Sequence, residues 1–160
     1  MPGSRPSAPK CSRSTRLRLG LPGLWVLTAG SAAAQLAPYQ VIGDGIPASL
    51  TSSAGDAAQG QAVFAKRQIT TCLLCHADPN AEGPQAAIGP SLRGVGARLT
   101  PAQIRLRLVD ARRINPETLM PPFYAVTDLQ RVAPAWQGQP ILTATQIEDL
   151  VAFLATLQTS

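Results

Sequence analysis

Apolar residues recur with the spacing of an α-helix in three separate stretches of the chain. The clearest stretch follows Thr143, a residue suited to cap a helix N-terminus, and its aliphatic residues form one stripe. These residues are Ile147, Leu150, Val151, Leu154 and Leu157. Similar spacing over residues 56–68 predicts a second helix, with Asp56 as its N-cap. Thr100 and Pro101 predict the start of a third helix, which should run to about Asp110.

Long stretches rich in proline, glycine and serine separate these helices. Residues 35–55 are predicted to form an extended N-terminal arm, and residues 77–99 a loop. Residues 115–122 are rich in turn-forming residues, and residues 123–142 are again irregular. The pattern therefore predicts an all-α domain over residues 56–160, with three or four short helices. Loops of this length in a small domain usually enclose something or carry function.

The N-terminus has the order of a secretion signal. Residues 1–18 are polar and basic, residues 19–30 are apolar, and residues 31–34 are small. The apolar stretch is shorter than the roughly 20 residues that a membrane helix needs. We therefore predict a signal peptide over residues 1–34, its removal, and a periplasmic chain without stable membrane insertion. The alternative is an uncleaved N-terminal anchor.

Composition and charge narrow the class of protein. The chain has 160 residues, enough for one domain, and aromatic residues make up only 4% of it. A core this poor in large rings would gain from a bound cofactor. Five of the 14 basic residues, but none of the nine acidic residues, lie within residues 1–34. The remaining chain carries nine charges of each sign, which argues against binding of nucleic acid.

The motif that carries chemistry is Cys-Leu-Leu-Cys-His at residues 72–76. It matches the C-x-x-C-H attachment site of c-type haem. The thiols of Cys72 and Cys75 would form thioethers with the haem vinyl groups, and His76 would ligate the iron. The predicted export signal fits this interpretation, because c-type haem is attached outside the bacterial cytoplasm. We therefore predict one covalently bound haem c.

Three other interpretations of the cysteines stay open at this stage. A thiol–disulfide redox motif would use Cys72 and Cys75 without His76, but it expects a βαβ setting that the pattern lacks. A zinc site needs four ligands, so a carboxylate or water would have to join the two cysteines and the histidine. The third alternative is a structural disulfide.

Because histidine and methionine are rare in this chain, few residues could be the second axial ligand of the iron. His76 is the only histidine, and Met120 is the only methionine besides Met1. We therefore expect Met120 to ligate the iron and to raise its reduction potential. The alternatives are that Met120 is ordinary core filler, that the sixth position is open or holds water, or that Lys66 is the ligand. The carbonyl of Pro90 is the expected acceptor for the other N–H of the proximal histidine.

Several arginines near these motifs permit two interpretations each. Arg93 and Arg98 could neutralise haem propionates or could be solvated at the surface. Four further arginines form a local basic cluster, which could be a docking face for an acidic partner or a solvated helix face. The cluster consists of Arg105, Arg107, Arg112 and Arg113.

The order of these motifs resembles that of the class I cytochromes c. A Cys-x-x-Cys-His motif is followed by Gly-Pro-x-Leu, a ligand methionine and an amphipathic C-terminal helix. Over about residues 56–157 the chain is similar, more narrowly, to the small cytochrome subunit X of the SoxAX complex of sulfur oxidation. The segments that carry this similarity are 88–98 (IGPSLRGVGAR), 113–124 (RINPETLMPPFY), 137–144 (QGQPILTA) and 148–154 (EDLVAFL).

The resemblance implies a fold, partners and a reaction. Gly60 and Phe64 of the first helix would pack against Phe153 or its neighbours on the last. A larger haem-bearing subunit, SoxA-like, would hold the catalytic haem. The complex would join thiosulfate oxidatively to a cysteine of a SoxYZ-like carrier, as an L-cysteine S-thiosulfotransferase. This chain would accept the electrons, pass them to a downstream cytochrome, and carry no catalytic residue itself.

Other functions would use the same haem motif. The chain could be a diffusible periplasmic electron shuttle or the haem subunit of another dehydrogenase. A five-coordinate haem sensor that binds a gas is a further alternative, against which Met120 argues.

Overall fold

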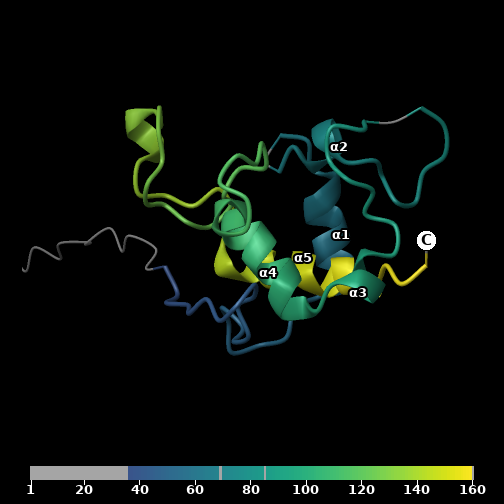
Figure 1. Ribbon diagram of the computed structural model, residues 1–160, viewed down its shortest axis with the longest axis horizontal. Helices are drawn as coiled ribbons and strands as arrows, with labels where there is room; N and C mark the ends of the chain where they lie inside the picture. The colour runs from purple at the N-terminus through teal and green to yellow at the C-terminus, as the bar shows by residue number, and fades with distance from the viewer. Residues whose placement is uncertain (1–35, 69, 85, 160) are drawn as a thin grey trace, which may run out of the picture. The chain divides into compact units, whose positions relative to one another are not determined.

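Helices and the loops between them make up the part of the chain that the computed structural model describes, residues 36–68, 70–84 and 86–159. The predicted signal peptide therefore lies outside the described residues. Within them, a bridge between Ile42 and Gly45 is the one β-type pairing, and no helix is long and apolar enough to cross a membrane. In chain order the helices are α1 (Ala57–Ala65), α2 (Cys72–Cys75), α3 (Val95–Arg98), α4 (Pro101–Asp110), the 3₁₀ helices η1 (Ala111–Arg113) and η2 (Pro134–Trp136), and α5 (Ala144–Thr156) (Figure 1).

The three long helices begin at the caps that the sequence predicts. The Asp56 carboxylate accepts hydrogen bonds from two backbone N–H groups of the first turn of α1. Thr100 and Thr143 each form a complete capping box, with Gln103 and Gln146 respectively. These side chains satisfy backbone N–H groups that would otherwise lack partners, which fixes where each helix starts.

The helices differ from the prediction in three places. Helix α1 ends at Ala65 and not at Gln68. Helix α3 lies within residues 77–99, which were expected to be loop throughout, and η2 interrupts residues 123–142. Both missed helices consist of about one turn, which is too short to produce a detectable apolar period.

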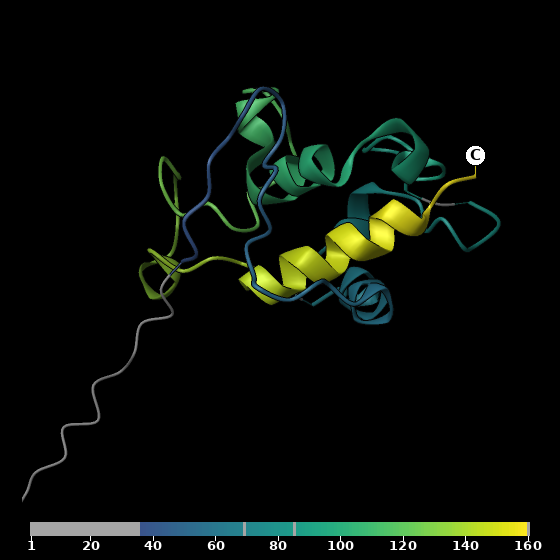
Figure 2. The same ribbon diagram turned by 90° about the horizontal axis from the view of Figure 1, so that it is seen from below.

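Helices α1 and α5 cross in close contact (Figures 1 and 2). At Gly60, any Cβ would collide with the backbone carbonyl of Asp149, so only glycine permits this approach. The rings of Phe64 and Phe153 pack beside the crossing, with centroids 5.6 Å apart. The predicted packing of the first helix against the last is therefore confirmed.

The hydrophobic core lies between α1, α4 and α5. Its fully buried side chains include Ile104 and Val109 of α4, and Ile147 and Leu150 of α5. Four of the five predicted stripe residues are buried in α5, and Glu148, Asp149 and Phe153 are buried beside them, so α5 buries more than the stripe. Leu157, the fifth stripe residue, caps the helix and is partly exposed.

The N-terminal arm packs onto α4 and α5. Ile46 and Leu50 are buried, and the Ile46 N–H donates to the carbonyl of Ala102 at 3.0 Å. The ring of Tyr39 packs on that of Tyr124, with centroids 6.3 Å apart. The arm is not extended throughout, because it turns back on itself at the bridge in residues 42–45.

Candidate cofactor site

A cavity of about 660 Å³ opens between α2, α4 and the loops that follow α2 and η1. Its size falls within the usual range of ligand pockets, and its walls are largely apolar. All five site residues that the sequence predicts line this one cavity, although they span 49 positions of the chain. They are Cys72, Cys75, His76, Pro90 and Met120.

Helix α2 is a single turn that presents both cysteines and the histidine together. It starts after Thr71, whose left-handed backbone (φ 52°) redirects the chain, and the His76 N–H donates to the Cys72 carbonyl at 2.8 Å. The two cysteines are not joined in a disulfide. Burial raises the pKa of the Cys72 thiol above its usual value.

The chemistry of the cavity disfavours two of the alternatives for these cysteines. Over the described residues, no three His, Cys, Asp or Glu side chains are grouped as a metal ion would require. The same part of the chain contains no βαβ unit around Cys72 and Cys75. The zinc and thioredoxin-type interpretations therefore lack the surroundings that they need.

Two neighbours fix the orientation of the His76 ring. Its Nδ1 lies 2.8 Å from the Pro90 carbonyl oxygen, the contact that the sequence predicts, and Nδ1–H must donate because a carbonyl only accepts. The ring also packs directly on Gly89, where a Cβ would lie 2.5 Å from Cε1. Since Nδ1 is engaged, Nε2 is the ring nitrogen left to bind a ligand.

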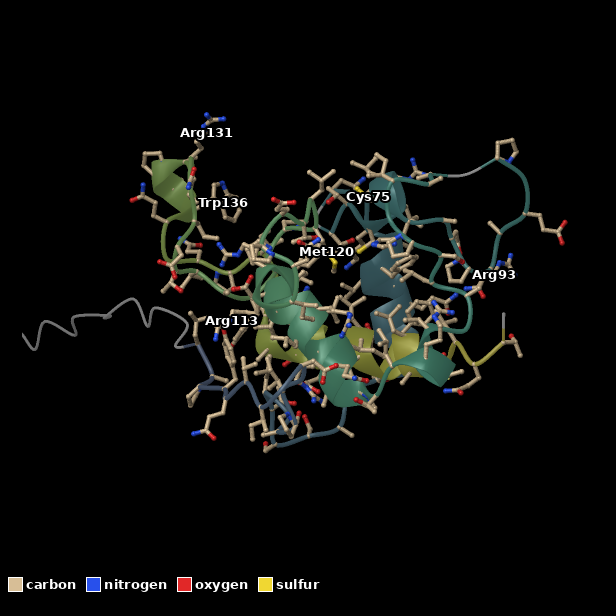
Figure 3. The ribbon with its side chains drawn as sticks, in the orientation of Figure 1. Cys75, Arg93, Arg113, Met120, Arg131 and Trp136 are labelled. Atoms are coloured by element: carbon tan, nitrogen blue, oxygen red, sulfur yellow. The ribbon has the colours of Figure 1, made fainter. Side chains whose placement is uncertain are left out.

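Met120 reaches the same cavity from the loop that follows η1. Figure 3 shows it near Cys75, which belongs to α2. The loop is held on both sides, because the Met120 N–H donates to the Thr118 hydroxyl at 3.2 Å and the Phe123 N–H donates to the Leu108 carbonyl at 3.1 Å. Lys66, the alternative ligand, is exposed at the end of α1 and takes no part in the cavity wall.

The arginines near the motifs differ in whether they line the cavity. Arg98 lines the cavity and donates to the backbone carbonyls of Ser91 and Arg93, whereas Arg93 donates to the Ala81 carbonyl and lines a different depression. Arg107 also lines the cavity. Of the two arginines considered for propionates, only Arg98 is therefore placed at the site.

The predicted basic cluster is wrong for two of its four members. Arg105 is only 6% exposed, and its guanidinium pairs with the Glu148 carboxylate at 2.7 Å. Arg112 pairs with Asp110, also at 2.7 Å. Glu148, which neutralises Arg105, lies 43 positions away in the sequence, so the local pattern could not reveal the pair.

Thr70 is a site residue that the sequence analysis missed. Its side chain is fully buried and lines the cavity. Its hydroxyl oxygen lies within hydrogen-bond distance of the carbonyl oxygens of Val63, at 3.0 Å, and Lys66, at 3.1 Å, and can donate to either. Thr70 thus joins the end of α1 to the turn that carries Cys72. A threonine between two short segments has no pattern that distinguishes it.

The cavity's donor set fits a covalent haem. Two thiols lie three residues apart on one helical turn, followed directly by an imidazole whose orientation is fixed. A thioether lies on the wall of the same apolar cavity, and Gly89 leaves room for the imidazole ring. This combination defines a c-type haem site.

Comparison with known proteins gives the class and then a particular relative. The family model of cytochrome c matches residues 57–158, so the chain belongs to the cytochrome c family and carries covalently bound haem c. Its structure is similar to a chain in the crystal structure of SoxXA from P. pantotrophus, with 35% identity and a TM-score of 0.66. The match covers 75% of this chain and 94% of that chain. The protein is thus a SoxX-like class I cytochrome c. No curated protein sequence matches it.

Proposed function

We propose that this chain is the electron-transfer haem subunit of a SoxAX-type complex. Cys72 and Cys75 attach the haem, and His76 and Met120 ligate its iron. The bound iron supplies one-electron chemistry, by alternating between the ferric and ferrous states. The observation that carries this proposal is the convergence of all four side chains on one apolar cavity.

The residues of the chain have distinct tasks in this function. The Pro90 carbonyl holds the His76 ring in one orientation and one tautomer, and it increases the basicity of the ligating nitrogen. Apolar side chains such as Phe64, Leu108 and Leu154 exclude water from the cavity. A thioether ligand and an apolar wall both favour the ferrous state, so the site should have a high reduction potential.

The partners follow from the resemblance to the SoxXA chain. We place a larger, SoxA-like haem subunit beside this chain, and a SoxYZ-like carrier as the protein to which that subunit joins thiosulfate. Electrons released there would enter this chain and leave to a downstream cytochrome. Removal of the predicted signal peptide, residues 1–34, during export would put this reaction in the periplasm. The thiosulfate chemistry itself belongs to the larger subunit.

The experiment is to isolate the mature protein from its native periplasm and to identify what accompanies it. We expect a larger c-type cytochrome in a one-to-one ratio, detected by haem stain and mass spectrometry. Thiosulfate together with the carrier should then reduce the haem of this chain, seen in the visible spectrum. A lone haem protein that thiosulfate does not reduce would contradict the proposal and would leave a diffusible shuttle.

A further inference from the structure

Residues 126–141 form a loop that projects from the helices, and we call it the projecting loop. In Figures 1 and 2 it stands apart from α4 and α5, and it carries the short helix η2. Its two ends meet where the Leu142 N–H donates to the Phe123 carbonyl at 2.9 Å. Phe123 is itself part of the cavity wall, so the loop begins directly beside the haem site.

The tip of the projecting loop is held by its own hydrogen bonds. The Trp136 N–H donates to the Ala133 carbonyl at 2.8 Å, and the Gln139 N–H donates to the Trp136 carbonyl at 3.2 Å. The side-chain amide of Gln139 also donates to the Ala135 carbonyl at 3.1 Å. Trp136 is therefore displayed on an ordered turn.

The base of the projecting loop is fastened by Arg112. Its guanidinium pairs with Asp110 and also donates to the backbone carbonyls of Thr127 at 3.2 Å and Asp128 at 2.7 Å. Asp128 and Arg131 both adopt left-handed backbone (φ 57° and 58°), which aspartate tolerates but which is unfavourable for arginine. Such conformations persist only where the surroundings impose them, and they are frequent at functional sites.

Trp136 leaves a large apolar surface in water. Its side chain belongs to η2, as Figure 3 shows, and is 62% exposed. Tryptophan is enriched among the residues that dominate protein–protein binding, and an ordered loop loses little entropy on binding. Arg131, an exposed cation of the same loop, has no ion-pair partner among the described residues.

We infer that Trp136 is the anchor by which this chain docks its electron-transfer partner. The partner would offer an apolar pocket for the indole, bordered by a carboxylate that faces Arg131. This inference rests on the proposed function, since the partner is the larger haem-bearing subunit of that complex. Docking at the projecting loop would hold the partner next to the segment that carries Met120.

The test compares Trp136→Ala with Ile42→Ala in the mature haem protein. Ile42 is a matched control, because it is apolar and 64% exposed but lies on the N-terminal arm. Binding to the purified larger subunit is measured by calorimetry at two salt concentrations. We expect Trp136→Ala to weaken binding about tenfold or more, and Ile42→Ala to leave it unchanged. The visible spectrum and reduction potential of both variants should equal those of the wild type.

A second variant tests the role of charge. Arg131→Gln should slow association and reduce the dependence of binding on salt, because it removes a cation that faces a carboxylate. Equal binding by the wild type and Trp136→Ala would contradict docking through the loop while leaving the proposed complex intact. Failure of the wild type to bind would contradict the proposed complex, and this inference with it. Loss of a wild-type dimer in Trp136→Ala would overturn it in favour of a second copy as occupant.

Discussion

At the scale of single residues, the side chains proposed to bind the haem depend on neighbours that are not themselves proposed ligands. The Pro90 carbonyl fixes the tautomer and orientation of His76, and Gly89 supplies the space in which the ring lies. Thr118 and the adjacent prolines fix the backbone around Met120. A site built in this way needs little rearrangement when its redox state changes, which suits electron transfer.

Replacing Met120 with alanine tests the distal ligand. Loss of the thioether should open the sixth position and lower the reduction potential, because methionine favours ferrous iron. We expect a fall greater than about 59 mV, which corresponds to a tenfold change in a one-electron equilibrium. Redox titration and the visible spectrum measure both effects.

Leu119→Ala is the matched control for this prediction, because Leu119 lies on the same loop and lines the same cavity without a ligating atom. Its spectrum should be that of the wild type. If Met120→Ala kept both the spectrum and the potential of the wild type, Met120 would not be the ligand.

At the scale of elements, the haem motif occupies a single turn that could not hold its shape alone. An isolated helix as short as α2 is unstable in water. Its position depends instead on Thr70, which connects it to the end of α1, and on the Gly89 N–H, which donates to the Cys75 carbonyl at 2.7 Å. Helix α1 is in turn fixed by its crossing with α5 at Gly60.

Thr70→Val should weaken the connection between α1 and α2. Valine keeps the shape of the side chain but leaves the buried carbonyls of α1 without the hydroxyl donor, which should lower the free energy of unfolding by about 1–3 kcal/mol. Denaturant unfolding measures this change. Since Thr70 adjoins Cys72, the fraction of chains that carry covalent haem should also fall.

Thr70→Ser retains the hydroxyl and should restore haem attachment close to the wild-type level. Equal attachment and equal stability in the valine and serine variants would show that the hydroxyl does not position the motif.

At the scale of the whole molecule, one buried ion pair connects parts of the chain that are far apart in sequence. The Glu148 carboxylate of α5 pairs with Arg105 of α4 and accepts from the Leu50 N–H at 2.9 Å. Arg105 also donates to the Ile46 carbonyl at 2.7 Å. The N-terminal arm is thereby fastened across both helices. Glu148→Ala would leave Arg105 buried without its partner and should cost about 3–5 kcal/mol of stability.

The same pair predicts how stability depends on pH. Burial raises the pKa of Glu148, but hydrogen bonds from Arg105 and the Leu50 N–H outweigh this effect, so the pKa lies below the usual value of 4.5. A carboxyl group with a lowered pKa in the folded state stabilises the protein above its unfolded pKa. This stabilisation should therefore be lost as the pH falls below about 4.5.

Unfolding free energies measured at several pH values check this prediction, with Glu148→Gln as the test variant. Its stability should depend less on pH in the acidic range than that of the wild type. Glu82→Gln, which removes an exposed carboxyl group, should retain the wild-type dependence. A glutamine variant at position 148 with an unchanged pH profile would contradict the assignment.

Features that depend on near neighbours along the chain were predictable from the sequence. The helix caps at Asp56, Thr100 and Thr143 were predictable because each acts within three residues of its own backbone. The spacing of Cys72, Cys75 and His76 is set by the covalent geometry of haem, so it is readable as a motif. Since the chain has one histidine and, besides Met1, one methionine, composition alone named the candidate axial ligands.

Which residues are buried and which are paired depends on the three-dimensional arrangement of the chain. Arg105 has the local pattern of a surface residue, yet Glu148 neutralises it in the interior. Thr70 lies on the cavity wall, and Trp136 remains exposed although it is among the most apolar side chains of its segment. The physical reason is that burial and ion pairing depend on contacts between residues distant in sequence, which local patterns do not record.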